Sequence, residues 1–189
     1  MVHIMNAIAS VVKKQYLLCI IFGRVPLRLT LYTDYALRLL MYLALKPDRL
    51  ATVKETSEAY GISRTHLMKV APNLVRGGFV ESVKGRGGGL RLKRRASEIR
   101  VGDVIRSTEE AFDGFRIVEC FNPARNTCRI TGSCRLRGVL REALEAYMMV
   151  LDRFTLADLA APDASLMDIL GISTMLPPAV AKTVNADHQ

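Results

Sequence analysis

The pattern of apolar and polar positions first becomes helical at Thr33. Apolar residues then recur with the i, i+3, i+4, i+7 spacing of one helix face: Leu37, Leu40, Met41 and Ala44. A Lys-Pro-Asp run at 46–48 closes the segment, because proline cannot continue a helix. The pattern therefore predicts a first helix that starts at Thr33 and ends before residue 46.

Two further helices are predicted on either side of a short turn at Gly61. Thr52 can cap a helix that runs through Tyr60, since Glu55, three residues later, completes a capping box. Ser63 can cap the next helix, which ends at 77–78. The inward positions of this helix are apolar and its outward positions polar, with Leu67, Val70, Leu74 and Val75 inward and Arg64, Thr65, His66, Lys69 and Asn73 outward. Two helices around a tight turn predict a helix-turn-helix.

Pro72 lies inside the second of these helices. Proline removes a backbone hydrogen bond, so we expect it to kink or shorten the helix. Residues 63–71 are then the part expected to reach DNA bases.

The next segment has the composition of a β-hairpin. Strand-like runs at Phe79–Val83 and Leu90–Leu92 flank a glycine-rich, cationic connection at 84–89. Such a hairpin after a helix-turn-helix is the wing of a winged helix, whose glycines let the backbone approach DNA. A phosphate-binding nucleotide loop is the alternative for the glycine run. It fails, because no Lys-Ser or Lys-Thr pair follows and the next element is a strand.

The second half contains a fourth short helix, a loop and one long helix. The short helix is predicted at Ile99–Ile105, and periodicity disappears between 108 and 133. From Cys134 an apolar stripe returns, formed by Leu136, Leu140, Ala143, Leu144, Tyr147, Met148 and Leu151. A stripe on a long helix near the chain end predicts pairing with a second copy, and burial in the chain's own core is the alternative.

The predicted fold class is mainly α with a small β-hairpin wing: a winged helix-turn-helix DNA-binding domain plus a long C-terminal dimerisation helix. The expected parts are a DNA-binding domain at 27–107, a cysteine loop at 108–134, a dimerisation helix with its following turn at 135–160, and a flexible tail at 161–189 with a helical turn at 165–170. Residues 1–26 are expected to be a disordered or artificial extension.

The distribution of charge supports the expected DNA-binding role of the first half of the chain. The 189 residues carry 27 Lys and Arg against 18 Asp and Glu, a net charge of +9. Between Ser63 and Arg95 Lys and Arg are frequent and Glu81 is the single acidic residue. This excess of positive charge predicts a polyanionic partner. The predicted DNA-binding set is Ser63, Arg64, Thr65, His66, Lys69, Lys84, Arg86, Gly87 and Arg91, with Arg86 in the minor groove.

Other classes of protein are disfavoured. No apolar run reaches the 18 or so residues of a membrane span, so we expect a cytoplasmic protein with no membrane partner. A nucleophile–base pair and a nucleotide motif are both missing from the sequence, so an enzyme is not expected.

Three cysteines form the second chemical signal, with the spacing Cys120-x7-Cys128-x5-Cys134. Thiolates in an irregular loop suit an iron–sulfur cluster or zinc, although zinc sites usually show paired CxxC spacings. Inert thiols in a reducing cell are the third alternative. Arginines lie between and beside the cysteines, where they either offset the charge of a cluster or form an ordinary solvated face: Arg125, Arg129, Arg135 and Arg137.

These residues together resemble a known family. The similar segments are Leu27–Thr30, Thr33–Arg38, Tyr60–Lys69, Gly85–Leu92 and Cys128–Leu136. In this order they resemble the winged-helix iron–sulfur transcriptional repressors of the NsrR, IscR and RirA type. A later segment, Leu151–Leu159, is most similar to the nitric-oxide-sensing NsrR branch.

The resemblance implies a homodimeric repressor on a palindromic double-stranded operator. It implies a [2Fe-2S] or [4Fe-4S] cluster on Cys120, Cys128 and Cys134, with Asp34 of the other subunit as a possible fourth ligand. The alternative for Asp34 is a favourable charge at a helix N-terminus. Nitric oxide is the implied signal, and nitrosylation releases DNA. The long first cysteine gap also resembles RirA, so an iron-responsive regulator with the same cluster is the alternative.

Overall fold

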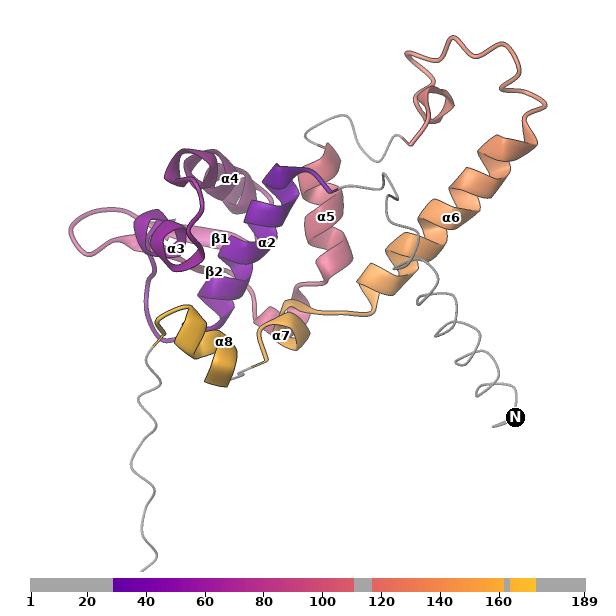
Figure 1. Cartoon of the computed structure of the whole chain (residues 1–189). Helices are drawn as coiled ribbons and strands as arrows, with labels where there is room; N and C mark the ends of the chain where they lie inside the picture. Colours follow the sequence, from indigo (N-terminus) through magenta and orange to yellow (C-terminus); the bar gives the residue numbers. More distant parts are fainter. Residues whose placement is uncertain (1–28, 111–116, 162–163, 173–189) are drawn as a thin grey trace, which may run out of the picture.

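The structure, a computed structural model, describes residues 29–110, 117–161 and 164–172 (Figure 1). Its elements in chain order are α2 (Leu31–Ala44), α3 (Val53–Tyr60), α4 (Arg64–Arg76), β1 (Val80–Val83), β2 (Gly89–Leu92), η1 (Ala96–Glu98), α5 (Val101–Glu110), η2 (Glu119–Phe121), α6 (Arg135–Asp152), α7 (Leu156–Leu159) and α8 (Ala164–Ile169). The expected mainly helical architecture with one hairpin is confirmed.

Helix α2 starts two residues before the predicted position and buries a different face. Thr30 is its N-cap and accepts a hydrogen bond from the Thr33 amide. The fully buried apolar residues are Ala36, Leu39, Leu40 and Leu43, whereas Leu37, Met41 and Ala44 are half-buried. The prediction missed this because α2 packs against α3, α4, α5, α7 and β2, so apolar residues surround most of its circumference.

The helix-turn-helix forms through the predicted caps. Thr52 and Glu55 make the capping box of α3, and Gly61 ends it with a left-handed φ of 61°. Ser63 caps α4 by accepting from the His66 amide at 3.4 Å.

The expected shortening of α4 at Pro72 is wrong, because the helix runs on to Arg76. Pro72 and Met68 both lie on the solvent side, so water can satisfy the Met68 carbonyl that loses its helical partner. Val75, predicted to point inward, is 37% exposed, and Ala71 takes the buried position instead.

The wing is an antiparallel pair in which Val80 lies opposite Leu92. Ala51 exchanges two backbone hydrogen bonds with Leu90, of 3.0 and 2.8 Å, and so fixes the hairpin to the segment before α3. The tip turns through Gly85 and Gly87, whose φ angles of 105° and 77° would strain most other residues.

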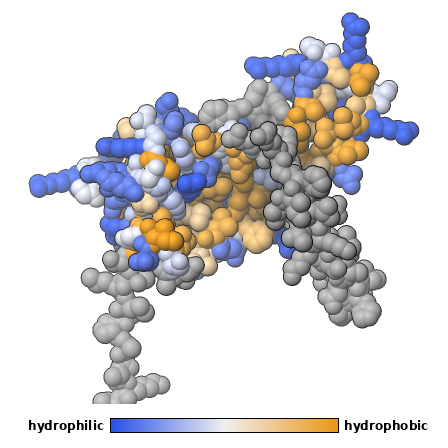
Figure 2. Space-filling view, viewed as in Figure 1, coloured by the Kyte–Doolittle hydropathy of each residue, from blue (hydrophilic) through white to orange (hydrophobic). Residues whose placement is uncertain are grey.

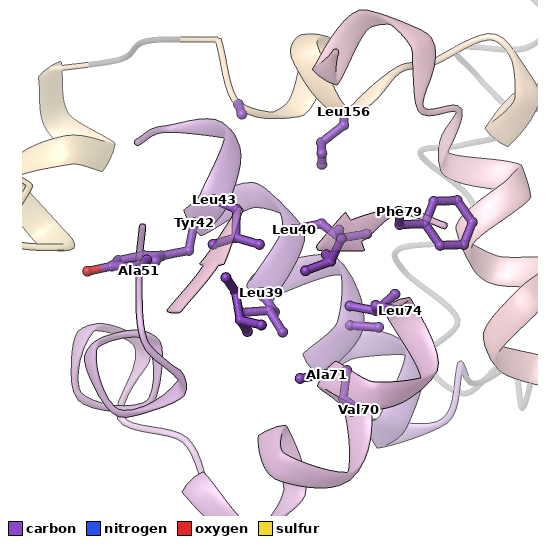
Figure 3. Close-up of a cluster of buried hydrophobic side chains, with 14 of the residues drawn as sticks. Leu39, Leu40, Tyr42, Leu43, Ala51, Val70, Ala71, Leu74, Phe79 and Leu156 are labelled. Carbon is purple, nitrogen blue, oxygen red and sulfur yellow. The ribbon is translucent and has the colours of Figure 1, made fainter. Parts of the chain in front are cut away.

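One apolar core joins the helix-turn-helix, the wing and the C-terminal segment. Figure 3 shows Leu39, Leu40 and Leu43 of α2 in the middle of this core, with Leu74 and Phe79 to the right and Leu156 above. Leu170 and Ile172, which follow α8, are also buried in this core. The predicted flexible tail at 161–189 is therefore wrong for 164–172, because these two apolar side chains anchor the segment; residues 173–189 lie outside the described residues.

Helix α5 begins at Val101 rather than Ile99 and continues to Glu110, beyond the predicted domain boundary at 107. The chain returns beside it after α6: the Val101 amide donates to the Phe154 carbonyl at 2.9 Å, and the Leu156 amide to the Ile99 carbonyl at 2.8 Å. These bonds hold the C-terminal end of α6 against the winged-helix domain.

Helix α6 projects away from the rest of the molecule, with the cysteine loop at its far end (Figure 1). The wing lies on the opposite side of the molecule in this view. In the described part of the chain, no helix has the length and apolarity that a membrane span requires. The expected extension at 1–26 lies outside the described residues.

Candidate nucleic-acid interface and metal centre

The first half of α4 presents a polar, solvent-facing surface. Its capping residue and the helix side chains predicted to reach DNA are all exposed: Ser63, Arg64, Thr65, His66 and Lys69. Leu67 and Val70 between them are fully buried and pack the helix onto the core. The helix is thus held rigidly with its polar face outward, as a recognition helix requires.

The wing adds cations beside this surface. Lys84, Arg86 and Gly87 are exposed at the hairpin tip, and Figure 2 shows hydrophilic side chains projecting from this side of the molecule. Arg91 is also exposed but forms an ion pair with Glu81 across the hairpin. Glu81 is the one acid among residues 63–95, so this pair leaves the other cations of that stretch without an acidic neighbour in their own segment.

Two tyrosines support the base of α4. The Tyr35 ring packs on His66 with centroids 5.7 Å apart, and the Tyr32 hydroxyl donates to the Lys69 carbonyl at 3.4 Å. A cavity of about 410 Å³ opens between α4 and the start of α2, lined by Thr30, Leu31, Tyr32, Tyr35, His66 and Lys69. Sequence patterns did not single out the tyrosines, because their role depends on the crossing of α2 and α4.

The three cysteines occupy different local settings. Cys120 is buried in η2, Cys128 is half-buried in a turn, and Cys134 is the half-buried N-cap of α6. All three are free thiols. In the described ranges, no three Cys, His, Asp or Glu side chains form a group that could hold a metal ion. The fold therefore places the thiols in one loop, and the described residues do not close a ligand set around them.

The turn around Cys128 is fixed through its backbone. The Asn126 side-chain oxygen accepts from the Cys128 amide at 3.1 Å, and the Thr131 hydroxyl donates to the Cys128 carbonyl at 2.7 Å. The Asn126 amide nitrogen also donates to the Thr131 hydroxyl at 3.0 Å. Sequence reasoning missed these two residues, although an Asn two positions before a cysteine is a signal for such a turn.

Asp34 lies in the first turn of α2, where it pairs with Arg38 at 2.9 Å. Both side chains are 39% exposed, so the carboxylate is accessible from outside the chain. In the described structure Asp34 belongs to no group of metal-ligating residues with the cysteines.

The start of α2 is held by a buried carboxylate that the sequence did not reveal. Glu109 of α5 is 6% exposed and accepts at one oxygen from the Thr30 amide and hydroxyl, each at 3.0 Å, and from the Thr33 hydroxyl. This contact joins the last turn of α5 to the first turn of α2. No local pattern marks Glu109, since its partners lie 76 and 79 positions away.

The donor set fits a thiolate-bound cluster in its chemistry, because soft metals prefer thiolates. The first turn of α6, next to Cys134, contains arginines and no acid. A helix N-terminus disfavours cations unless an anion is near. Arg137 Nε is buried there and has no hydrogen-bond partner within the described part of the chain. An anionic group at this end of α6 would satisfy both features.

Comparison with known proteins places this architecture in one family. The Rrf2 family model, described as an iron-dependent transcriptional regulator, matches residues 29–162. The chain belongs to the Rrf2 family. The HTH-type transcriptional regulator NsrR of Shouchella clausii is 46% identical over 149 residues, covering 78% of this chain and 98% of that protein. The NsrR regulator of Halalkalibacterium halodurans is 48% identical over 145 residues, covering 76% and 97%.

A solved Rrf2-type structure has the same fold. CymR, titled the global cysteine regulator of Bacillus subtilis, aligns with a TM-score of 0.55 and 26% identity, over 72% of this chain and 99% of CymR. The winged-helix fold predicted from the sequence is confirmed. Since its Rrf2 relatives are transcriptional regulators, the chain is a transcriptional regulator and not an enzyme.

Proposed function

We propose that this Rrf2 protein is a repressor that binds a palindromic double-stranded operator as a homodimer, in the cytoplasm, and releases it in response to nitric oxide. The observation that carries the proposal is the exposed polar face of α4 beside a cationic wing. Arg64, Thr65 and His66 read base edges in the major groove, Lys69 neutralises a phosphate, and Arg86 enters the flanking minor groove.

The rest of the DNA-binding set has supporting roles. Ser63 holds the start of α4 by capping it, and Gly87 lets the wing backbone approach the DNA closely. Lys84 adds positive charge at the wing tip. Arg91 reaches a phosphate only if its pair with Glu81 opens, so it contributes less than Lys69.

Helix α6 supplies the dimer contact in this proposal. Leu136 of the predicted stripe is 60% exposed, and the neighbouring apolar residues Val139 and Met149 are 60% and 63% exposed, so much apolar surface of α6 finds no cover in the described chain. Figure 2 shows this hydrophobic surface over the region of α6. Of the seven stripe residues only Met148 is buried, and it is still 9% exposed, which argues against burial in the chain's own core. A second copy offers the same surface and gives two α4 helices for two half-sites.

The sensing site is an iron–sulfur cluster, [2Fe-2S] or [4Fe-4S], bound by Cys120, Cys128 and Cys134 and completed by Asp34 of the partner subunit. Free thiols, a cationic first turn of α6 and similarity to NsrR proteins support this assignment. When bound, the cluster supplies iron atoms that react with nitric oxide.

The chain's own residues connect this site to the DNA-binding surface. Arg106 of α5 pairs with Asp152 at the C-terminal end of α6, with Nη1–Oδ1 at 2.8 Å. Glu109 then joins α5 to the start of α2. A shift of α6, or loss of the contact to Asp34, therefore changes the position of α2 and of the α4 helix packed on it.

The test uses anaerobically purified protein and a duplex selected by it from a randomised DNA pool. Lys69→Ala weakens binding by about the same factor on all duplexes and lowers the slope of log affinity against log salt by about one. Lys54→Ala removes a cation from α3, where it pairs with Glu58, and serves as the control. If Lys69→Ala and the control have the same slope of log affinity against log salt, Lys69 of α4 does not contact a DNA phosphate.

A second candidate function is iron-responsive regulation through the same thiols, favoured by the description of the family as iron-dependent. It predicts that an iron chelator abolishes operator binding without nitric oxide. If the chelator releases the operator only slowly, and about one equivalent of nitric oxide per cluster releases it at once, nitric oxide is the signal.

A further inference from the structure

Arg137 combines three features that no contact among the described residues explains. It is the third residue of α6, its Nε is buried, and this N–H has no hydrogen-bond partner in the described ranges. A buried donor left unpaired costs free energy, so such atoms usually have a partner in the functional state. Arg137 is therefore expected to meet an acceptor that lies outside the described residues of the chain.

The position of Arg137 on α6 narrows the identity of that acceptor. Cys134 is the N-cap of α6, and its side chain makes no capping hydrogen bond. Residues three apart on a helix face the same side, so Arg137 lies one turn above Cys134. The third helical residue is also the one whose side chain reaches back to the N-cap in a capping box.

The charge at this helix end points to an anion. Arg135 and Arg137 both lie in the first turn, and no acid accompanies them there. Two cations at a helix N-terminus are repelled by its partial positive charge, so this arrangement is unfavourable unless an anion lies nearby. Free backbone N–H groups at the same end prefer an anionic acceptor as well.

We propose that Arg137 donates its Nε–H to a sulfur atom of the cluster that Cys134 helps to hold, and thereby positions and stabilises the cluster. The inference rests on the proposed function, since it requires the cluster to bind. Arg137 acts as a positioning residue, while the cysteine thiolates remain the ligands. An N–H···S bond and the positive charge both stabilise the more negative, reduced state, so they raise the reduction potential.

The experiment compares Arg137→Gln with Arg141→Gln in the full-length protein. Arg141 lies one turn further along α6 and is exposed, so the control loses the same charge from the same helix. Iron and acid-labile sulfide content, the cluster reduction potential and the rate of iron loss to a chelator are measured anaerobically. Arg137→Gln is expected to lower the potential and to speed iron loss about 10-fold, whereas Arg141→Gln matches the wild type.

Arg137→Lys separates the hydrogen bond from the charge. Lysine keeps the charge but lacks the Nε–H near the helix, so iron loss remains faster than in the wild type. Full recovery in Arg137→Lys, or equal behaviour of Arg137→Gln and Arg141→Gln, overturns the assignment. A change confined to dimer dissociation or melting of the metal-free protein also overturns it. Wild-type protein without iron and sulfide would instead refute the proposed cluster.

Discussion

Asp34 and Arg137 carry opposite charges at the starts of two different helices. Asp34 lies where the dipole of α2 favours an acid, and Arg137 lies where the dipole of α6 disfavours a cation. Local electrostatics therefore account for Asp34 even without metal, whereas they leave Arg137 unexplained. Of the proposed ligands, Asp34 is therefore the one that most needs a direct test.

Replacing Asp34 by Asn tests its place in the ligand set. As a helix-dipole and Arg38-pairing residue alone, its loss lowers the free energy of unfolding by only about 0.5 kcal/mol. As a ligand, its loss also changes the visible spectrum and speeds iron release. Spectra and iron contents identical to those of the exposed-loop control Asp48→Asn would remove Asp34 from the ligands.

At the scale of single residues, sequence reasoning identified groups with local signals. The caps at Thr52 and Ser63 were predicted, because a capping residue and its partner lie within three positions. The role of Glu109 was not predicted, because it depends on contacts between helices that are distant in the sequence. The unpaired N–H of Arg137 was not predicted either, because it depends on the burial of one atom.

At the scale of elements, α5 connects the base of α6 with the start of α2. Its end carries Glu109, and its middle carries Arg106, which pairs with Asp152. Gly102 faces the same carboxylate so closely that an added Cβ would lie 1.9 Å from Asp152 Oδ1. The crossing of α5 and α6 thus depends on a residue without a side chain at this position.

The contact between α5 and α2 predicts a stability effect. Glu109→Ala removes the acceptor of the Thr30 amide and hydroxyl, while the Thr33 hydroxyl keeps Thr108 Oγ1 at 2.9 Å as an acceptor. A buried donor left unpaired costs about 1–3 kcal/mol. Urea unfolding of the metal-free protein measures the loss, with exposed Glu98→Ala as the control. Equal unfolding midpoints in the two variants would mean that this carboxylate does not hold the start of α2.

The contact between α5 and α6 predicts a pH effect. Hydrogen bonds from Arg106 lower the pKa of Asp152 below its ordinary value. The pair therefore stabilises the fold fully above the ordinary aspartate pKa of about 3.9, and this contribution is lost as the pH falls through the lowered pKa. Asp152→Asn is less stable than the wild type at pH 7, and the difference shrinks in acid; a constant difference from pH 7 to pH 2 would contradict the assignment.

Element boundaries were predicted less well than element types. The helix-turn-helix and hairpin followed from caps, glycines and strand-like runs, all of which are local. The buried face of α2 and the anchored segment at 164–172 were missed, since both depend on which distant elements pack against them. The predicted shortening of α4 at Pro72 was wrong because Pro72 lies on the solvent side of the helix.

For the whole molecule, the proposed dimer rests on the exposed apolar residues of α6, among them Leu136 and Val139. Val139→Glu places a charge on this exposed apolar surface. The proposed dimer then dissociates at micromolar concentration, because a buried unpaired charge is costly. Analytical ultracentrifugation measures the dissociation, and Arg141→Glu changes a neighbouring exposed position as the control. A Val139→Glu dimer as stable as the control would place the interface elsewhere.

In the proposed function, the state of the cysteine site controls DNA binding. The most direct test titrates nitric oxide into anaerobic protein bound to its selected duplex, with cluster absorbance and DNA anisotropy recorded together. Both signals are expected to fall in step as nitric oxide approaches stoichiometry with the cluster. Loss of absorbance with DNA still bound at the original affinity would contradict it.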